Sequence, residues 1–354
     1  MSEDNPRRPT PPHLFVDEEW LAQRSEETID PGRPIVDAHH HLWVVHKPYM
    51  PPELLADLQS GHMIRGTVFI ECSFMYRADG DPRLASLGEI EYANGVGASF
   101  ASNFYGPIRA CAGIVGKVDL TLGAAAEEVL QAAVARAPDR LRGIRHMSGW
   151  DASPAVNILR HPPPPHRMMD AKFREGLSKL APLGLSFDAQ CYHPQLPELI
   201  DLVDAFPDTL FIANHLAGLV RLGPYAGNDD EVLGGWRAAM KELAKRQNVV
   251  IKVGGLGMRW FGFDYMDHQY PPTSADLAAD WKPLVESCIE AFGPSRTMFE
   301  SNFPVDKASC SYRALWNAYK RIVAGYSESE KADLFAGTAI RAYRLPEELG
   351  QPAA

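Results

Sequence analysis

The sequence predicts a TIM (β/α)8 barrel, a closed ring of eight parallel β-strands surrounded by α-helices. The first observation is a series of eight short runs rich in apolar and β-branched residues, each hydrophobic throughout rather than at alternate positions. Such runs are typical of parallel strands that are buried on both faces. The second observation is that helical patterns separate most of these runs, as in repeated βα units. The third is the length of 354 residues, which allows one large barrel domain.

The eight expected strands begin with a run that ends in three histidines. They cover residues 34–41, 66–72, 110–116, 141–147, 183–190, 210–214, 249–255 and 297–301. The main alternative is an open, doubly wound sheet, which binds nucleotides through a glycine-rich loop that follows a strand. No G-x-G-x-x-G or G-x-x-x-x-G-K sequence follows any of the eight runs, so the barrel is favoured.

Five helices are expected between the strands, because apolar residues recur there with helical spacing. They cover residues 124–137, 172–183, 196–206, 236–246 and 277–292. The segment 73–109 has a helical pattern only in part. The linking segments between the first strands are therefore the least regular part of the predicted barrel.

The chain divides into an N-terminal arm (1–33), the barrel (34–345) and a C-terminal tail (346–354). The arm is expected from its polar, proline-rich composition. Two irregular segments, 161–166 with four consecutive prolines and 259–274 with many aromatic residues, follow expected strands. They are expected at the rim of the substrate pocket, or else as loops packed on the surface.

The net charge of −10 argues against a surface for nucleic acid or for an anionic membrane. Five scattered cysteines contain no C-x-x-C pair, which is typical of reduced thiols in a cytoplasmic protein. The N-terminal residues lack the apolar segment of a signal peptide, and no run is long enough to span a membrane. We therefore expect a cytoplasmic protein that acts on a small molecule, and the arm and long loops favour a homo-oligomer.

The chemistry is expected at the end of the first strand, which reads D-A-H-H-H-L-W over residues 37–43. Residues two apart on a strand share a face, so His39 and His41 are expected inside the barrel and His40 outside it. Two imidazoles at the open end of a barrel can ligate a divalent metal, or bind a substrate carbonyl or carboxylate.

The same motif resembles the start of the amidohydrolase-related superfamily, in the branch that holds L-fuconolactonase, 4-sulfomuconolactone hydrolase and 2-pyrone-4,6-dicarboxylate lactonase. The resemblance spans about residues 34–345. Further matches are Val68–Glu71, Gly143–His146, Gln195–Pro197, Asn214–Ala217, Ser301–Asp306 and Ala339–Leu345. It implies an amidohydrolase-like barrel with its active site at the carboxyl ends of the strands.

The resemblance also implies roles for individual residues. His39 and His41 occupy metal-ligand or carbonyl-binding positions, and His215 matches a strand-six histidine that polarises the carbonyl or helps to hold the metal. Glu71 falls where lactonase relatives place a glutamate near the metal or substrate. Arg145 can grip a substrate carboxylate, although an arginine that only pairs with a glutamate of the barrel is the alternative.

Strand eight departs from the family pattern. Relatives usually read G-S-D-W-P, and their aspartate activates water, whereas this chain has Asn302 there. An amide cannot take up a proton at neutral pH. Three interpretations stay open: Asn302 orients the water while another base acts, with Glu300 as the candidate; the site works without a metal through its histidines and Arg145; or the protein binds or isomerises a ligand without hydrolysis.

Strand five adds further candidates at its end. Gln190 is expected to bind substrate, and His193 to bind substrate or to complete a metal site with His39 and His41, or else to lie in a surface loop. Asp306, just past strand eight, is expected to cap a helix N-terminus. An apolar wall for a substrate ring is expected from four aromatic residues, Trp43, Trp260, Phe261 and Tyr265.

The leading functional prediction is a hydrolase that opens a lactone or another cyclic ester of a small compound, carboxylated or derived from an aromatic one. Water would attack a carbonyl polarised by a divalent metal, zinc or manganese, or by the histidine cluster. A metal-dependent decarboxylase or hydratase of an aromatic acid is the second prediction, by analogy of fold. A barrel that binds a ligand without catalysis is the third.

Overall fold

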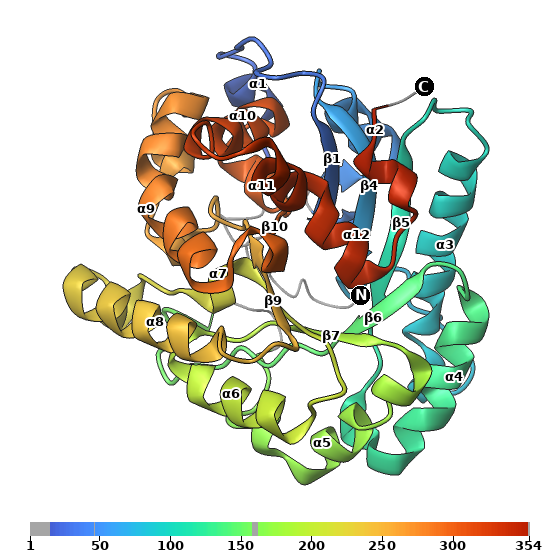
Figure 1. Cartoon of the computed structure of the whole chain (residues 1–354). Helices are drawn as coiled ribbons and strands as arrows, with labels where there is room; N and C mark the ends of the chain where they lie inside the picture. The colour runs from blue at the N-terminus through green and yellow to red at the C-terminus, as the bar shows by residue number, and fades with distance from the viewer. Residues whose placement is uncertain (1–14, 46, 158–161, 353–354) are drawn as a thin grey trace, which may run out of the picture.

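The computed structural model of the chain describes residues 15–45, 47–157 and 162–352. Eight strands form one parallel sheet that curls into a nearly closed barrel, with helices around it (Figure 1). They are β1 (Pro34–His40), β4 (Met63–Ile70), β5 (Arg109–Gly116), β6 (Leu141–Arg145), β7 (Ser186–Ala189), β8 (Phe211–Ala213), β9 (Val249–Val253) and β10 (Thr297–Phe299). Each overlaps one of the eight expected runs, so the predicted barrel is confirmed.

The ring closes between the carboxyl ends of β10 and β1. A parallel bridge joins His40 to Phe303, where the His41 N–H donates to the Phe303 carbonyl at 2.8 Å. The Asn302 N–H donates to the His39 carbonyl at 2.9 Å. The barrel therefore closes through the backbone of His39, His40 and His41, which are the residues of the expected site. These contacts hold the segment after β10 beside the histidine motif.

Asp37 strengthens this closure from inside the molecule. Its Oδ1 accepts the Ser301 N–H at 2.8 Å, and its Oδ2 accepts the Tyr312 hydroxyl at 2.9 Å. Burial raises the pKa of Asp37 to about 6, against the opposing effect of these hydrogen bonds. The first residue of the D-A-H-H-H motif thus ties β1 to the end of β10.

Helices cover the outside of the barrel (Figure 1). They are α2 (Pro51–Leu58), α3 (Leu87–Ala101), α4 (Ala126–Arg136), α5 (Ala171–Leu177), α6 (Leu196–Ala205), α8 (Asp229–Leu243), α9 (Ser274–Phe292) and α10 (Tyr312–Ile322), with the short α1 (Glu18–Leu21), α7 (His215–Gly218), α11 (Glu328–Ala332) and α12 (Thr338–Tyr343). A two-stranded antiparallel sheet, β2 (Trp43–Val44) with β3 (Pro48–Tyr49), follows β1.

Two helices differ from their predicted lengths for identifiable reasons. Helix α8 begins seven residues earlier than expected, because three acidic residues in its first turn suit a helix N-terminus although two glycines interrupt its pattern. Helix α5 ends at Leu177 rather than at 183, and Pro182 lies in the separate 3₁₀ turn that follows. Helix α3 is continuous, although it contains three glycines.

The amino ends of the strands are closed by the C-terminal part of the chain. An apolar cluster joins residues of the strands, including Val36, Val68 and Met298, to Ile340 of α12 and to Leu349. Figure 1 shows α12 lying in front of the strands in this view. The other end of the barrel, where the strands finish, is therefore the end at which the candidate site lies.

The described part of the N-terminal arm, residues 15–33, packs on the barrel. Lys320 of α10 donates to the carbonyls of Ile29 and Asp30 at 2.9 and 2.8 Å. The Trp20 indole donates to the His268 carbonyl at 3.1 Å. The segment 162–166 is irregular apart from a turn at its end, and His161 lies outside the described residues.

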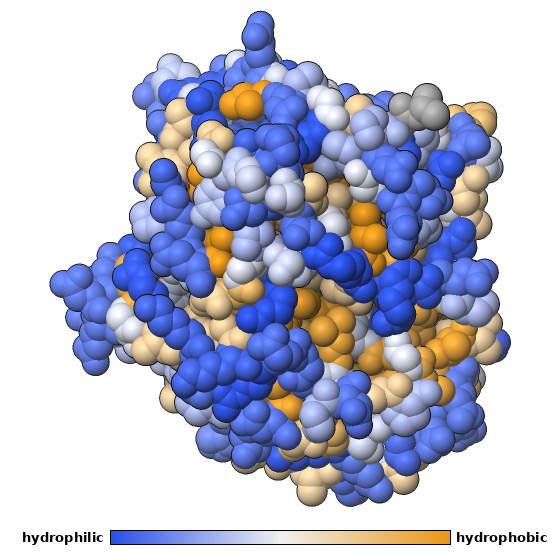
Figure 2. Space-filling model, in the orientation of Figure 1, coloured by the Kyte–Doolittle hydropathy of each residue, from blue (hydrophilic) through white to orange (hydrophobic). Residues whose placement is uncertain are grey.

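No helix in the described ranges is long and apolar enough to cross a membrane. On the face shown in Figure 2, hydrophilic side chains cover most of the outline, and apolar side chains show mainly in hollows between the helices.

Candidate active site

His39 and His41 lie together at the carboxyl end of β1. Their Nε2 atoms are 3.2 Å apart, and the side chains are almost completely buried. His40 points the other way, and its Nε2 lies 2.8 Å from the Thr67 hydroxyl. The alternation of a strand therefore brings His39 and His41 to one side, as expected from the spacing.

The surroundings of both imidazoles lower their pKa values. Burial lowers the pKa of His39 well below its usual range, and the neighbouring charge of Lys252 acts in the same direction. Burial and Arg145 do the same for the pKa of His41. The His41 Nδ1 donates to the Ile70 carbonyl at 2.9 Å, which leaves its Nε2 lone pair facing His39.

Glu300 lies between two of the histidines. Its Oε1 accepts a hydrogen bond from the His215 Nδ1 at 2.6 Å. Its Oε2 lies 2.8 Å from the His39 Nδ1 but has no hydrogen-bond partner among the described residues. A Cβ at Gly254 on the neighbouring segment would overlap the Glu300 side chain, so that glycine makes room for the carboxylate. The structure thus groups Glu300 with both histidines.

His215 is held in an unusual backbone turn. His215, Leu216, Ala217 and Gly218 all have positive φ, at 52°, 53°, 53° and 70°. Consecutive left-handed residues cost roughly 1–2 kcal/mol each when they are not glycine, and such strain collects at functional sites. The Trp236 indole donates to the Leu216 carbonyl at 2.9 Å and helps to hold this turn.

Arg145 and Glu71 are paired with each other. The Arg145 Nε donates to the Glu71 Oε1 at 2.8 Å, and Nη2 donates to the Glu71 carbonyl. Nη1 lies 3.5 Å from the His39 Nε2. The guanidinium therefore has a barrel glutamate as its partner and also faces the histidine pair.

Lys252 and Asp188 form a second buried ion pair beneath His39. The Lys252 Nζ lies 2.8 Å from the Asp188 Oδ2 and 3.5 Å from the His39 Nδ1. The Tyr343 hydroxyl also donates to the Asp188 Oδ2, at 2.9 Å. Sequence reasoning missed Lys252, although a lysine inside the apolar run V-V-I-K-V was the available signal.

Asn302 is fixed by Asp306. The Asn302 Nδ2 donates to the Asp306 Oδ1 at 2.8 Å, while the Asp306 Oδ2 accepts the Gly257 N–H at 2.9 Å. Burial raises the pKa of Asp306 to about 8. The Asp306 carboxyl is therefore engaged by Asn302 and by the segment after β9, not by the helix N-terminus that the sequence led us to expect.

His193 lies apart from the other candidate ligands. Its Nδ1 accepts the Val220 N–H at 3.2 Å, and its ring packs edge-on against Tyr225 at 5.0 Å between centroids. Among the described residues, the group that offers ligand atoms within 4.8 Å of one another is His39, His215 and Glu300. The structure does not bring His193 to His39 and His41.

A small cavity of about 10 Å³ adjoins His215. It is lined by Gln190, Cys191, Tyr192, Asn214, His215, Gly218, Leu219, Met258, Trp260 and Phe261. The Trp43 ring stacks on His41, with 5.1 Å between the ring centroids, whereas the Tyr265 hydroxyl donates a hydrogen bond to Asp280. Of the four aromatic residues expected to form an apolar wall, Trp260 and Phe261 line the cavity and Trp43 stacks on His41. Tyr265 does not line the cavity.

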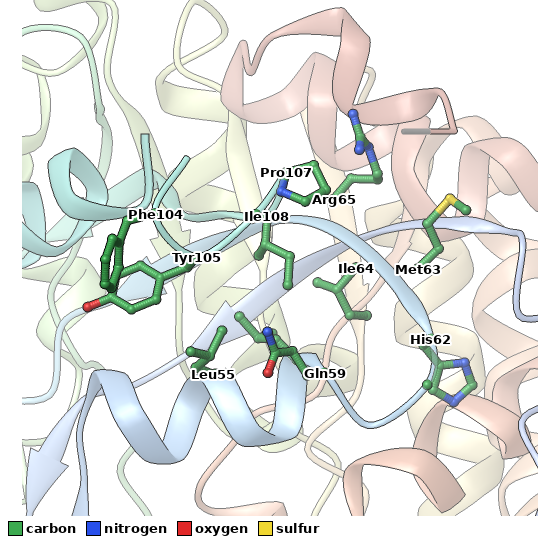
Figure 3. A pocket seen from close by; sticks show the side chains of 13 residues that line it. Leu55, Gln59, His62, Met63, Ile64, Arg65, Phe104, Tyr105, Pro107 and Ile108 are labelled. Atoms are coloured by element: carbon green, nitrogen blue, oxygen red, sulfur yellow. The ribbon is translucent and has the colours of Figure 1, made fainter. Parts of the chain in front are cut away.

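A larger groove, of about 620 Å³, lies at the other end of the barrel. In Figure 3, Leu55 of α2 and Gln59, which follows that helix, face Ile64 and Ile108, which belong to the start of β4 and the segment before β5. None of the candidate site residues lines this groove. Size alone therefore does not mark the site in this barrel.

The Nε2 atoms of His39 and His41 are placed so that they could ligate one divalent metal ion. Two ligands bound to one zinc at 2.0–2.1 Å in tetrahedral geometry lie roughly 3.3 Å apart, close to the 3.2 Å between the Nε2 atoms of His39 and His41. The His41 Nε2 lone pair, left free for a ligand by the contact of Nδ1 with the Ile70 carbonyl, is a second feature that suits a cation. His39 and His41 would hold the ion, with Glu300 on the other side of His39, where carboxylates commonly orient metal-binding histidines.

The profile of the amidohydrolase family matches residues 36–345 of this sequence. The chain belongs to the amidohydrolase family. This finding confirms the predicted resemblance and makes the protein an enzyme of hydrolase type.

Similar proteins agree with that assignment. This amidohydrolase is 32% identical over 337 residues to the uncharacterised protein y4mH of Sinorhizobium fredii, covering 88% of this chain and 98% of that protein. It is 30% identical over 237 residues to an L-fucono-1,5-lactonase of Burkholderia multivorans, covering 67% of this chain and 72% of the relative. A zinc-bound amidohydrolase of Burkholderia multivorans has the same fold, with a TM-score of 0.67 at 23% identity, covering 88% of this chain and all of that one.

Proposed function

We propose that this amidohydrolase hydrolyses a lactone, the cyclic ester of a small hydroxy acid. The observation that carries the proposal is one buried group in which the His39–His41 pair adjoins the hydrogen-bonded pair of His215 and Glu300. The first pair could hold a divalent cation that polarises a carbonyl, and the second can accept a proton, which are two requirements of ester hydrolysis. The 30% identity to an L-fucono-1,5-lactonase supports this chemistry.

The His39–His41 pair is proposed to hold a divalent cation beside the reacting carbonyl. Their Nε2 atoms share one side of the site, and Arg145 Nη1 lies 3.5 Å from that of His39. A divalent cation bound there would supply Lewis-acid polarisation of the carbonyl. The Arg145 guanidinium adds positive charge where the oxyanion develops, and its pairing with Glu71 holds it in place.

His215 is proposed to take the proton of the attacking water at Nε2. Its Nδ1 already donates to the Glu300 Oε1 at 2.6 Å, so Glu300 fixes the ring and stabilises the imidazolium that forms. A carboxylate serves a histidine base in this way in hydrolytic triads. The Asn302 amide cannot take the proton, so its proposed role is to orient the water.

The same histidine completes the reaction. The bond from the water oxygen to the carbonyl carbon forms as the ring C–O bond breaks, and His215 returns its proton to the departing alkoxide oxygen. The product is an open hydroxy acid, which ionises near neutral pH and releases one proton to solution. Each turnover therefore consumes one equivalent of added base.

Base consumption at constant pH tests the proposal on a panel of five- and six-membered lactones, with the metal content of the same preparation measured in parallel. We expect one equivalent of base per lactone opened, and loss of this activity in His215→Asn. Release of carbon dioxide from aromatic acids without lactone turnover would instead identify a decarboxylase. Tight lactone binding without any turnover would identify a binding protein, and either result would overturn the proposal.

A further inference from the structure

Asn214 carries a buried hydrogen-bond acceptor with no partner. It is the first residue after β8, it is only 1% exposed, and it lines the small cavity beside His215. Its Oδ1 is buried and has no hydrogen-bond partner among the described residues. An acceptor left unpaired in this way costs about 1–3 kcal/mol, so a donor is expected to occupy the cavity when the site is filled.

The orientation of this amide is fixed by its other end. The Asn214 Nδ2 donates to the Asp188 Oδ2 at 3.0 Å and to the Ile212 carbonyl at 3.2 Å. The reversed amide would place its oxygen against that carboxylate, which is electrostatically unfavourable. Oδ1 is therefore the end of this amide that lacks a partner among the described residues.

Gln190 brings a donor to the same cavity from the neighbouring strand. The Asn214 N–H donates to the Ala189 carbonyl at 3.0 Å, so the two segments lie side by side. The Gln190 Oε1 accepts the Gly149 N–H at 3.2 Å, which leaves Nε2 as the end of the amide that can donate. Both residues line the cavity, and among the described residues Asn214 offers an unpaired acceptor and Gln190 an amide nitrogen that can donate.

The cavity has the size and charge of a hydroxyl site. Its volume of about 10 Å³ is close to the minimum that holds one water molecule. None of its ten lining residues is a lysine or an arginine, and five are large apolar or aromatic residues. The nearby cations are already paired, Arg145 with Glu71 and Lys252 with Asp188.

We propose that Asn214 and Gln190 form a subsite for a hydroxyl group on an uncharged substrate. The hydroxyl donates to the Asn214 Oδ1 and accepts from the Gln190 Nε2, while the apolar wall packs against the carbon ring. This inference rests on the proposed lactonase function and narrows it, because the subsite selects hydroxylated lactones over carboxylated ones. A carboxylate cannot donate to the Asn214 oxygen.

Calorimetric binding of lactams tests the subsite separately from hydrolysis, because the amide ring is not opened as an ester would be. Three six-membered lactams are compared: one with ring hydroxyls, one unsubstituted and one carrying a carboxylate. Each is titrated into the purified protein, into Gln190→Glu and into Gln247→Glu. The last is a matched control, since Gln247 is an exposed residue in the turn before β9.

We expect the hydroxylated lactam to bind about tenfold more tightly than the other two. Gln190→Glu keeps an oxygen for Gly149 but removes the donor and adds a negative charge, so it should abolish this preference, whereas Gln247→Glu should retain it. Equal affinity for the three lactams, or a preference that Gln190→Glu retains, overturns the subsite. If Gln190→Glu does not fold, the affinities of the three lactams for the original protein still decide the test.

Hydrolysis of the corresponding three lactones separates the two proposals. If hydroxylated lactams bind through Gln190 but no lactone is opened, the subsite stands and the proposed function fails. If lactones are opened without regard to their hydroxyl groups and the lactams show no preference, the subsite fails and the proposed function stands.

Discussion

The Nδ1 of His215 lies 2.6 Å from the Oε1 of Glu300, in the interior of the barrel. Glu300 comes two residues before Asn302, the position at which an aspartate was expected from the family pattern. An acidic group is therefore present just after strand eight, but it contacts His215, whose Nε2 has no hydrogen-bond partner among the described residues. We infer that proton transfer in this chain runs through His215.

Breaking the Glu71–Arg145 pair should destabilise the fold. Both side chains are at least nine-tenths buried, so Glu71→Gln leaves a guanidinium without its counter-charge. We expect a loss of about 3 kcal/mol in the free energy of unfolding, measured by chemical denaturation. The partly exposed helix pair Lys282–Glu286 is the control, and Glu286→Gln should cost less than about 1 kcal/mol. Equal effects would mean that the buried pair contributes no more than a surface contact.

Gly218→Ala should prevent formation of the turn that carries His215. A Cβ at this position would overlap the Cys191 carbonyl oxygen, and the residue has φ 70°. We expect a loss of more than about 3 kcal/mol, seen as a lowered melting temperature or failure to fold. Gly234→Ala is the matched control, because a Cβ there meets open space within α8, and it should stabilise the protein by about 0.5–1 kcal/mol. A stable, active Gly218→Ala protein would refute the described turn.

Asn302→Asp restores the residue of the family pattern, yet it should not raise the rate. The new carboxylate would stand beside the Asp306 oxygen that Asn302 now contacts at 2.8 Å. Two adjoining carboxyls cannot both ionise without a large cost, so the variant should lose stability steeply as pH rises. Melting temperatures at about pH 6 and about pH 9 measure this. An increase in both kcat and metal affinity would show that the site still works through an acid at position 302.

The buried Asp306 should make stability depend on pH. Its folded-state pKa, raised to about 8, lies above that of the unfolded chain, so the native state binds the proton more tightly. This contribution to stability is present at low pH and is lost as pH rises through about 8, amounting to about 3 kcal/mol between pH 6 and pH 9. Asp306→Asn cannot titrate, so the difference in unfolding free energy between the two proteins should change over that range. A constant difference would mean that Asp306 is ionised throughout.

The barrel was predictable because its strands are buried on both faces. Runs such as Val249–Val253 are almost uniformly apolar, so hydrophobicity alone marks them. Helices were harder to predict where glycines interrupt the pattern, as in α3 and at the start of α8. Their stability comes from packing against the barrel, which the local sequence does not record.

The site was predictable where strand periodicity decides it. The two-residue spacing of His39 and His41 places both on one side. The spacing of Glu300 and Asn302 does not decide their faces, because β10 ends at Phe299 and Asn302 has φ 56°. The position of His193 depends on the path of the loop after β7, which spacing does not specify. The left-handed turn at His215 was likewise hidden, because three of its four residues are not glycine.

The most direct test of the account is the kcat of Glu300→Gln on the best lactone substrate, compared with the exposed control Glu19→Gln. Glutamine keeps the size of the side chain but cannot stabilise a protonated His215. We predict a fall in kcat of about a hundredfold or more, with KM changed less than about threefold, while Glu19→Gln stays at the original rate. A folded Glu300→Gln protein that keeps its kcat would contradict proton transfer through the His215–Glu300 pair.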